Sequence, residues 1–218
     1  MEFRVSPERR QPASASRRAR VGALADALDG PQMDRLQFLL AAVRDFHHVG
    51  TLWPSSHAAA REIARAVGPG RRHIVEYGAG DGAVTAELLK VLAPEGKLLA
   101  LEINEEFCDS LAEMGDDRLT VRRRDIVDFV QNGARELTAL GASGFDAIVS
   151  GIPLSFHSAA ERAMIVRRTH DLLAPGGVFI VYQVSPVFFP AVKRAFPKAK
   201  LTFSPRNLPP YFIAVAEK

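Results

Sequence analysis

The chain has almost no cysteine, because Cys108 is the only one among its 218 residues. A single cysteine excludes the internal disulfide framework that supports many small secreted domains. Long apolar runs are also lacking, since no stretch reaches the roughly 18 uncharged apolar residues of a membrane-spanning helix. The first twenty residues contain no apolar secretion signal. These absences predict a cytoplasmic protein.

Excess charge of either sign is small, with a formal net charge of +3. Residues 1–20 nevertheless contain six arginines against two glutamates, so the basicity is concentrated in one arm. Apolar residues at helical spacing then predict an amphipathic helix over 17–29 and a second helix after Pro31. We predict that residues 1–48 form a basic arm with amphipathic helices, which contacts an anionic membrane surface or covers the binding site. Residues 49–218 are predicted to form the main domain.

Strands and helices are predicted to alternate along the main domain. Strand patterns occupy 73–77, 97–102, 118–123, 145–150 and 178–184, and helical patterns occupy 56–67, 83–92, 104–114, 126–139 and 159–173. This alternation predicts a doubly wound α/β fold, a parallel sheet with helices on both faces. The last two strand patterns, 200–204 and 211–218, are joined by P-R-N-L-P-P without a helix. We therefore predict seven strands, with an antiparallel last strand.

A glycine-rich loop follows the first predicted strand. Residues 76–82 read E-Y-G-A-G-D-G, and glycines there allow a sharp turn that brings backbone N–H groups close to a ligand. Glu102 ends the second predicted strand, where a carboxylate can accept both hydroxyls of a ribose. Residues 78–83 also satisfy G-x-G-x-x-G/A, so a nicotinamide dinucleotide is the rival ligand.

Three features favour S-adenosylmethionine over a dinucleotide. Glu76 lies at the mouth of the loop, where it would repel a pyrophosphate but suits a cationic ligand. Asp125 follows the third strand, where a carboxylate can reach the adenine amino group. With the closing hairpin, these features resemble the class I methyltransferase pattern over 73–218. The resemblance implies a Rossmann-like sheet with S-adenosylmethionine as methyl donor and S-adenosylhomocysteine as product.

The segment after the fourth strand, S-G-I-P-L-S-F over 150–156, usually touches the methyl acceptor in this class. Adenine-methylating enzymes of the ribosomal dimethyltransferase type carry N-L-P-Y-like residues there, which hold the base and stack on it. Gly151 and Leu154 replace the asparagine and the aromatic residue, so no nucleic-acid partner is expected.

The same segment resembles the S-G-L-P-L segment of bacterial phospholipid N-methyltransferases, which convert phosphatidylethanolamine stepwise into phosphatidylcholine. Residues 49–64 are similar to that family's G-A-x-x-P-S-S-x-x-L-A segment, and residues 206–215 to its N-L-P-P-A segment. The resemblance spans about 36–218. Asp81 stands where the family usually has threonine, and Tyr211 replaces a small residue.

The resemblance also implies a set of site residues. Cofactor contacts are expected from Thr51, Leu52, Pro54, Ser55, Ser56, Glu76, Tyr77, Gly78, Gly80, Gly82, Glu102, Ile103, Asp125, Ile126 and Ser150. The transfer channel is expected to be lined by Ser150, Gly151 and Pro153.

The acceptor amine must present a free lone pair, although a primary amine is mostly protonated at neutral pH. Either a base removes the proton or desolvation lowers the amine's pKa. The candidate bases are His157, Tyr182 and the His47-His48 pair. No histidine shows metal-ligand spacing with acids or Cys108, so no metal is expected.

We therefore predict an N-methyltransferase of phosphatidylethanolamine, bound peripherally at the inner face of the cell membrane. Ornithine lipid or another small amine is the alternative acceptor, and RNA adenine comes third. A protein of another class, a catalytically silent membrane-binding protein that has kept the fold, is also considered. The sequence does not decide the oligomeric state, and a monomer is favoured.

Overall fold

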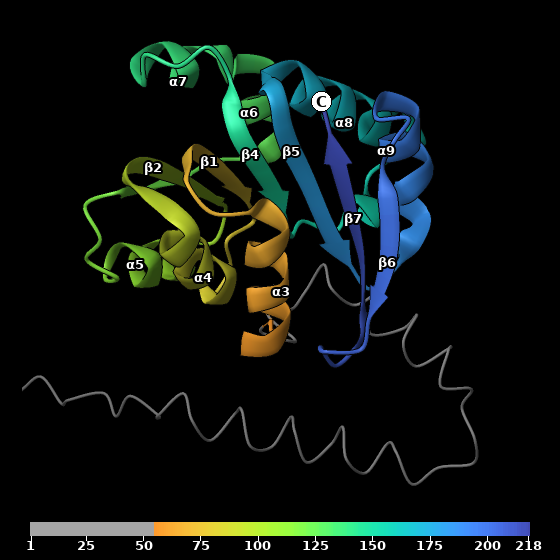
Figure 1. Cartoon of the computed structure of the whole chain (residues 1–218), viewed down its shortest axis with the longest axis horizontal. Coiled ribbons are helices and arrows are strands. Elements are labelled where there is room, and N and C mark those ends of the chain that lie inside the picture. The colour runs from red at the N-terminus through yellow and green to blue at the C-terminus, as the bar shows by residue number, and fades with distance from the viewer. Residues whose placement is uncertain (1–54) are drawn as a thin grey trace, which may run out of the picture. The chain divides into compact units, whose positions relative to one another are not determined.

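The computed structural model describes residues 55–218 (Figure 1). The predicted basic arm and its two helices fall in residues 1–54 and lie outside the described residues. The same holds for five predicted site residues: Thr51, Leu52, Pro54, His47 and His48.

A seven-stranded sheet forms the centre of the described domain. Its strands are β1 Arg71–Tyr77, β2 Leu92–Glu102, β3 Leu119–Arg123, β4 Phe145–Ser150, β5 Leu173–Gln183, β6 Lys200–Ser204 and β7 Tyr211–Glu217. Their order across the sheet is β3-β2-β1-β4-β5-β7-β6. Strands β1 to β5 pair in parallel, whereas β7 runs antiparallel to both β5 and β6. The predicted doubly wound α/β fold with an antiparallel last strand is confirmed.

Helices cover both faces of the sheet (Figure 1). One face carries α3 His57–Val67, α4 Ala83–Val91 and α5 Glu105–Ala112, and the other carries α6 Ile126–Asn132, α7 Ala134–Ala139, α8 Ala159–Leu172 and α9 Phe189–Ala195. Short 3₁₀ turns, η2 Leu154–Phe156 and η3 Pro186–Phe188, follow β4 and β5. Among the described residues, no helix is long and apolar enough to cross a membrane.

Strands β2 and β5 begin five residues earlier than expected, at Leu92 and Leu173, and two helical features also differ from the sequence-based expectation. The single helix expected over 126–139 is divided at Gly133, which caps α6 and begins α7. Gly133 lies against Leu172 of α8, where an added Cβ would come within 2.9 Å of Cδ1. Helix α9 has no counterpart in the prediction, because its seven residues are too few to show a clear apolar period.

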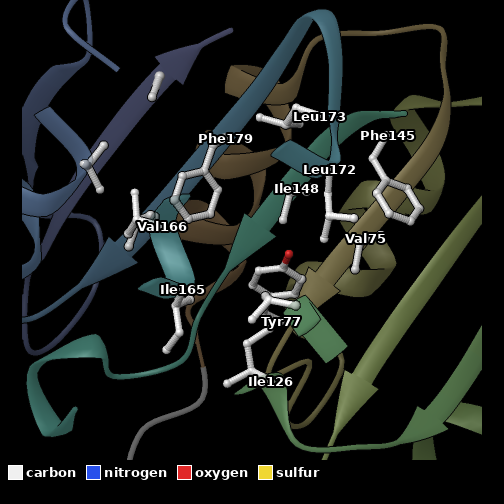
Figure 2. Packing of buried hydrophobic residues seen from close by; sticks show 14 of the residues in the cluster. Val75, Tyr77, Ile126, Phe145, Ile148, Ile165, Val166, Leu172, Leu173 and Phe179 are labelled. Carbon is white, nitrogen blue, oxygen red and sulfur yellow. The ribbon is translucent and has the colours of Figure 1, made fainter. Parts of the chain in front are cut away.

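The core consists of two apolar layers, one on each face of the sheet. Figure 2 shows the larger layer, which contains Val75 and Phe179 of the strands and Ile165 of α8. Successive strand residues point to opposite faces. Tyr77 therefore lies in this larger layer with Val75, whereas Glu76 faces α4 on the other side of the sheet.

The carboxyl ends of the parallel strands form one edge of the sheet, here called the carboxyl edge. It carries the last residues of β1 to β5, namely Tyr77, Glu102, Arg123, Ser150 and Gln183. Because β7 is antiparallel, its first residue Tyr211 lies at the same edge, opposite Ser204 of β6. The strand order reverses between β1 and β4, and open α/β sheets bind ligands at the carboxyl side of such a reversal. The fold thus brings the predicted motifs to one place.

Candidate functional site

The glycine loop between β1 and α4 has the geometry of a ligand cradle. Gly78, Gly80 and Gly82 have φ angles of 73°, 55° and 82°, in the left-handed region that favours glycine. A Cβ on Gly78 would lie 2.7 Å from the Cγ2 of Ile152, and a Cβ on Gly82 would lie 2.2 Å from the Cε of Met114. A Cβ on Gly80 would meet nothing within 4 Å. The loop is packed at both ends and open in its middle, where a ligand can approach the backbone.

Glu102 fixes this loop from the neighbouring strand. Its Oε2 accepts a hydrogen bond from the N–H of Gly80 at 2.8 Å, and its Oε1 accepts from the N–H groups of Ile103 and Asn104 at 2.8 and 2.9 Å. A carboxylate offers about four acceptor positions, so these three bonds leave capacity for a ribose hydroxyl. Glu102 thus holds the glycine loop in place while it remains available to a ligand.

Glu76 is a fully buried acid beneath the same loop. Its Oε2 accepts a hydrogen bond from the Oγ1 of Thr85 at 2.6 Å, and its Oε1 has no partner among the described residues. Burial raises the pKa of this carboxyl from 4.5 to about 8; the Thr85 bond lowers it, and the charges of Asp81 and Glu102 raise it. A buried oxygen without a partner calls for an explanation. A positively charged ligand such as S-adenosylmethionine fits here, because it would stabilise the ionised carboxylate.

Asp125, the residue predicted to meet adenine, and the predicted cofactor contacts Ile103 and Ile126 lie beside the ends of β2 and β3. Asp125 caps α6, where its Oδ1 accepts from the N–H of Val127 at 2.7 Å, and its side chain is exposed. Ile103 is 65 % exposed and can cover a planar ring. The side chain of Ile126 is buried in the larger core layer, so a ligand can meet only its backbone. The same holds for Tyr77, whose hydroxyl lies 3.3 Å from the Oγ1 of Thr169 in the core.

The turn after β4 is held tightly against β1 and β5. The N–H of Gly151 donates to the carbonyl of Tyr77 at 2.9 Å, and the Nε2 of Gln183 donates to the carbonyl of Ile152 at 2.8 Å. The hydroxyl of Ser150 and the Oε1 of Gln183 are buried without a partner among the described residues. Two free acceptor oxygens therefore lie where β4 and β5 end. Sequence reasoning missed Gln183, although a polar residue at the end of an apolar strand was the available signal.

Two tyrosines lie beside this turn: the hydroxyl of Tyr182 lies against Gly151, and Tyr211 packs against Tyr182. The rings of Tyr182 and Tyr211 lie 5.4 Å apart between centroids at 55°, and the hydroxyl of Tyr211 lies 3.3 Å from the Oγ of Ser55. Burial raises the pKa of Tyr182 well above 10, and the charge of Glu76 raises it further. The Tyr182 hydroxyl therefore stays protonated at neutral pH, so it can donate or accept a hydrogen bond but is a poor base.

Ser56, in the segment before β1, is hydrogen-bonded to the loop between β6 and β7. The N–H of Ser56 donates to the Oδ1 of Asn207 at 2.8 Å, and the Oγ of Ser56 donates to the carbonyl of Arg206 at 2.5 Å. Ser56 is also the N-cap of α3, where its Oγ accepts from the N–H of Ala59 at 3.1 Å. Asn207 is buried and was not predicted as a site residue. These bonds fix the start of α3 beside the loop between β6 and β7.

The remaining predicted residues lie nearby in chain and space. Pro153 precedes η2, and His157 ends that turn with its N–H bonded to the carbonyl of Leu154 at 3.2 Å. Leu154 itself is fully buried. Within residues 55–218, no cluster of three or more histidine, cysteine or acidic side chains could hold a metal ion.

Comparisons with known proteins agree with this geometry. The family described as "Methyltransferase domain" matches residues 75–179. The ornithine lipid N-methyltransferase of Singulisphaera acidiphila is 31 % identical over 183 residues, which cover 79 % of this chain and 92 % of that protein.

Solved structures of methyltransferases share the fold. The precorrin-6y C5,15-methyltransferase of Geobacter metallireducens superposes with a TM-score of 0.60 at 15 % identity, over 77 % of this chain and 93 % of that one. The 1,6-didemethyltoxoflavin-N1-methyltransferase of Burkholderia thailandensis, solved with S-adenosylhomocysteine bound, gives 0.58 at 17 % identity, over 87 % and 92 %.

The site has three features that suit S-adenosylmethionine: an open glycine loop, a buried acid with an unpaired oxygen, and a carboxylate at the end of β2. Together with the methyltransferase relatives, these features identify S-adenosylmethionine as the cofactor. With the strand order and the homology to a lipid N-methyltransferase, they show that this chain belongs to the class I S-adenosylmethionine-dependent methyltransferases.

Proposed function

We propose that this enzyme methylates the amine in the headgroup of a membrane lipid, and that ornithine lipid is the acceptor. The observation that carries the proposal is the 31 % identity, over nearly the whole relative, to a protein named ornithine lipid N-methyltransferase. Phosphatidylethanolamine is the second candidate, because S-G-I-P-L at 150–154 resembles the matching segment of phospholipid N-methyltransferases.

The turn after β4 argues against a nucleic-acid base as acceptor. Base-methylating sites hold the flipped base between stacking side chains. The residue at the stacking position is Leu154, which is fully buried in the core and cannot reach a base. Gly151 offers no side chain, and the space beside it is filled by the hydroxyl of Tyr182. A small amine needs neither a stacking platform nor a wide pocket, so it suits this turn better.

Positioning supplies much of the rate in this reaction. When bound, S-adenosylmethionine would supply an electrophilic methyl group, and its sulfur would become a neutral thioether. The chain therefore has to bring the amine in line with the methyl group rather than stabilise a developing anion. The cradle at Gly80, held by Glu102, fixes the donor. The hydrogen bond from Gln183 to the carbonyl of Ile152 holds the turn that is proposed to contact the acceptor.

The ammonium proton must leave before transfer. Tyr182 is a poor base because burial keeps its pKa high. Among the candidate bases that the structure describes, His157 remains, half-buried at the end of η2. Partial desolvation at the turn assists, because burial disfavours the charged amine. His157 and the buried turn are thus proposed to share the task of freeing the lone pair.

A methyl-transfer assay with two lipids tests the proposal. The full chain is incubated with labelled S-adenosylmethionine and vesicles that contain ornithine lipid or phosphatidylethanolamine, and the extracted lipids are separated by headgroup. Label in ornithine lipid at a kcat/KM at least tenfold above that for phosphatidylethanolamine supports the first candidate. The reverse order supports the second. Labelled lipid in neither vesicle, while S-adenosylmethionine still binds, would overturn the proposal.

A further inference from the structure

The exposed large apolar side chains gather at one edge of the sheet. Among the described residues they are Ile103, Val187, Phe203 and Leu208, which are 65, 52, 58 and 74 % exposed. Ile103 follows β2, Val187 follows β5, Phe203 is the next-to-last residue of β6, and Leu208 lies between β6 and β7. All four therefore lie at the carboxyl edge. This is the edge from which an acceptor must reach the donor.

Ile103 has a separate explanation, because it lies beside Glu102 on the side of the site assigned to adenine. The other three, Val187, Phe203 and Leu208, are here called the apolar rim. They belong to the β5–β7–β6 half of the sheet, away from the cofactor strands β1 to β3. Neither the donor nor the core accounts for their exposure.

Val187 borders the turn that is proposed to meet the acceptor. It lies in η3, which packs against η2, the turn of Leu154–Phe156. The next residue, Phe188, is fully buried and anchors η3 in the core. Burial of Phe188 thus presents Val187 to solvent beside the acceptor turn.

Leu208 is held outward by a fixed loop. Its neighbour Asn207 is buried, accepts from the N–H of Ser56 and donates through Nδ2 to the carbonyl of Pro209 at 3.0 Å. Prolines at 209 and 210 restrict the backbone that follows. Leu208 therefore cannot fold back into the core without breaking these partly buried hydrogen bonds. Leu208 thus adds a fixed, exposed apolar side chain to Val187 and Phe203 at the carboxyl edge.

The charges around Leu208 favour an anionic surface. Arg206 is exposed two residues before it, and Arg61 is exposed on α3, which begins beside this loop. The acid that faces them is Glu62, which pairs with Arg206 at 3.2 Å. Cations that flank exposed apolar side chains form the pattern of proteins that lie in the headgroup region of anionic membranes.

We infer that the apolar rim inserts into the headgroup layer of an anionic bilayer and so brings the acceptor turn to the lipid. This inference rests on the proposed lipid acceptor. A bilayer suits the rim because its side chains stand on three separate segments and have the exposed Arg61 and Arg206 near them. A lipid amine must also enter from the carboxyl edge. Residues 1–54 and a second copy of the chain are the other possible occupants.

A fluorescent label at Leu208 tests the insertion. The full chain carries Cys108→Ser and Leu208→Cys, labelled with an environment-sensitive dye, and is mixed with vesicles of phosphatidylethanolamine and phosphatidylglycerol. Insertion predicts a blue shift on vesicle addition and quenching by lipids with brominated acyl chains. The matched control is Ser143→Cys in the same background, because Ser143 is exposed in the turn before β4, at the opposite edge of the sheet. Its label should not shift.

Activity separates the inference from the proposed function. Leu208→Ser should weaken vesicle binding and vesicle-lipid methylation by roughly tenfold, the effect of losing one buried aliphatic side chain. Methylation of a water-soluble short-chain amino lipid should stay unchanged. If vesicle lipid is methylated while the Leu208 label stays unshifted, the inference fails and the function stands. If no lipid of either form is methylated, the proposed function fails.

The label also distinguishes the other occupants. A blue shift without vesicles that grows with protein concentration would indicate a second copy. A blue shift without vesicles that is independent of concentration would indicate that residues 1–54 cover the rim. Either result would overturn the bilayer as occupant.

Discussion

The hydroxyl of Tyr182 lies directly against Gly151, because a Cβ added at Gly151 would sit 2.3 Å from that oxygen and 3.2 Å from the carbonyl of Gly78. The first residue after β4 therefore touches both the glycine cradle and β5. Donor loop and acceptor turn are linked through this one contact, so a side chain at Gly151 must displace one of them.

We expect Gly151→Ala to disturb both substrates. The methyl group forces the turn or Tyr182 to move, which should cost about 1–3 kcal/mol of stability. The kcat/KM for methyl transfer should fall by at least tenfold, as reacting groups tolerate little misplacement. Steady-state kinetics and thermal unfolding measure the two effects. Adding Tyr182→Ala removes the clashing ring, so the double variant should unfold at a higher temperature than additivity predicts. Strict additivity would contradict the contact.

Glu76 predicts a pH-dependent affinity for the donor. Its pKa is about 8 without ligand, mainly because of burial, so near pH 6 most molecules carry the neutral acid. A cationic donor prefers the ionised form, and binding must then release a proton. The affinity for S-adenosylmethionine should therefore rise as the pH increases from 6 to 8 and level off above 8. Calorimetry in buffers of different ionisation enthalpy measures both the affinity and the proton release.

Two variants control this prediction. Glu76→Gln cannot ionise, so its affinity should be weaker at pH 8 and nearly independent of pH. Thr85→Val removes the hydrogen bond that lowers the pKa, so the rise should move to higher pH. If the affinity of the wild type for S-adenosylmethionine is as independent of pH as that of Glu76→Gln, Glu76 does not interact with the methyl donor. The raised pKa also implies that the ligand-free fold loses stability as the pH rises from 4.5 towards 8, and that Glu76→Gln lacks this loss.

Much of the donor site follows from the sequence, because its residues stand at the ends of regular strands. The loop over 76–82 and Glu102 occur at the positions where a parallel sheet brings them together. The acceptor side is harder to predict, since it depends on contacts between distant segments. Asn207 bonds to Ser56 across 151 positions of chain, and no local pattern encodes that pairing. The roles of Tyr77 and Ile126 were also beyond local patterns, because only the packed sheet shows that their side chains are in the core.

The link between Asn207 and Ser56 predicts a stability effect. Asn207 is buried and joins the start of α3 to the loop between β6 and β7. Asn207→Leu removes the hydrogen bonds to the N–H of Ser56 and the carbonyl of Pro209, both partly buried, which should cost about 0.5–1.5 kcal/mol each. Asn207→Asp keeps the acceptor and should cost less. Chemical denaturation of both variants measures the difference. Equal stability of wild type and Asn207→Leu would show that this link does not support the fold.

Gln183 is expected to position the acceptor turn rather than the donor. Its Nε2 holds the carbonyl of Ile152, and its free Oε1 lies buried at the end of β5, on the same face of the sheet as the unpaired hydroxyl of Ser150. Gln183→Leu removes the bond to the turn, so kcat should fall by about 10- to 100-fold while the Kd for S-adenosylmethionine changes less than threefold. Gln183→Glu removes the N–H that donates to the turn but keeps the shape of the side chain, so its kcat should resemble that of Gln183→Leu. Ser150→Ala leaves the turn bonded and should retain more activity than either variant. The Kd for S-adenosylmethionine and the single-turnover rate of each variant test this role. A Gln183 variant that weakens S-adenosylmethionine binding as strongly as it slows transfer would place this residue in the donor site instead.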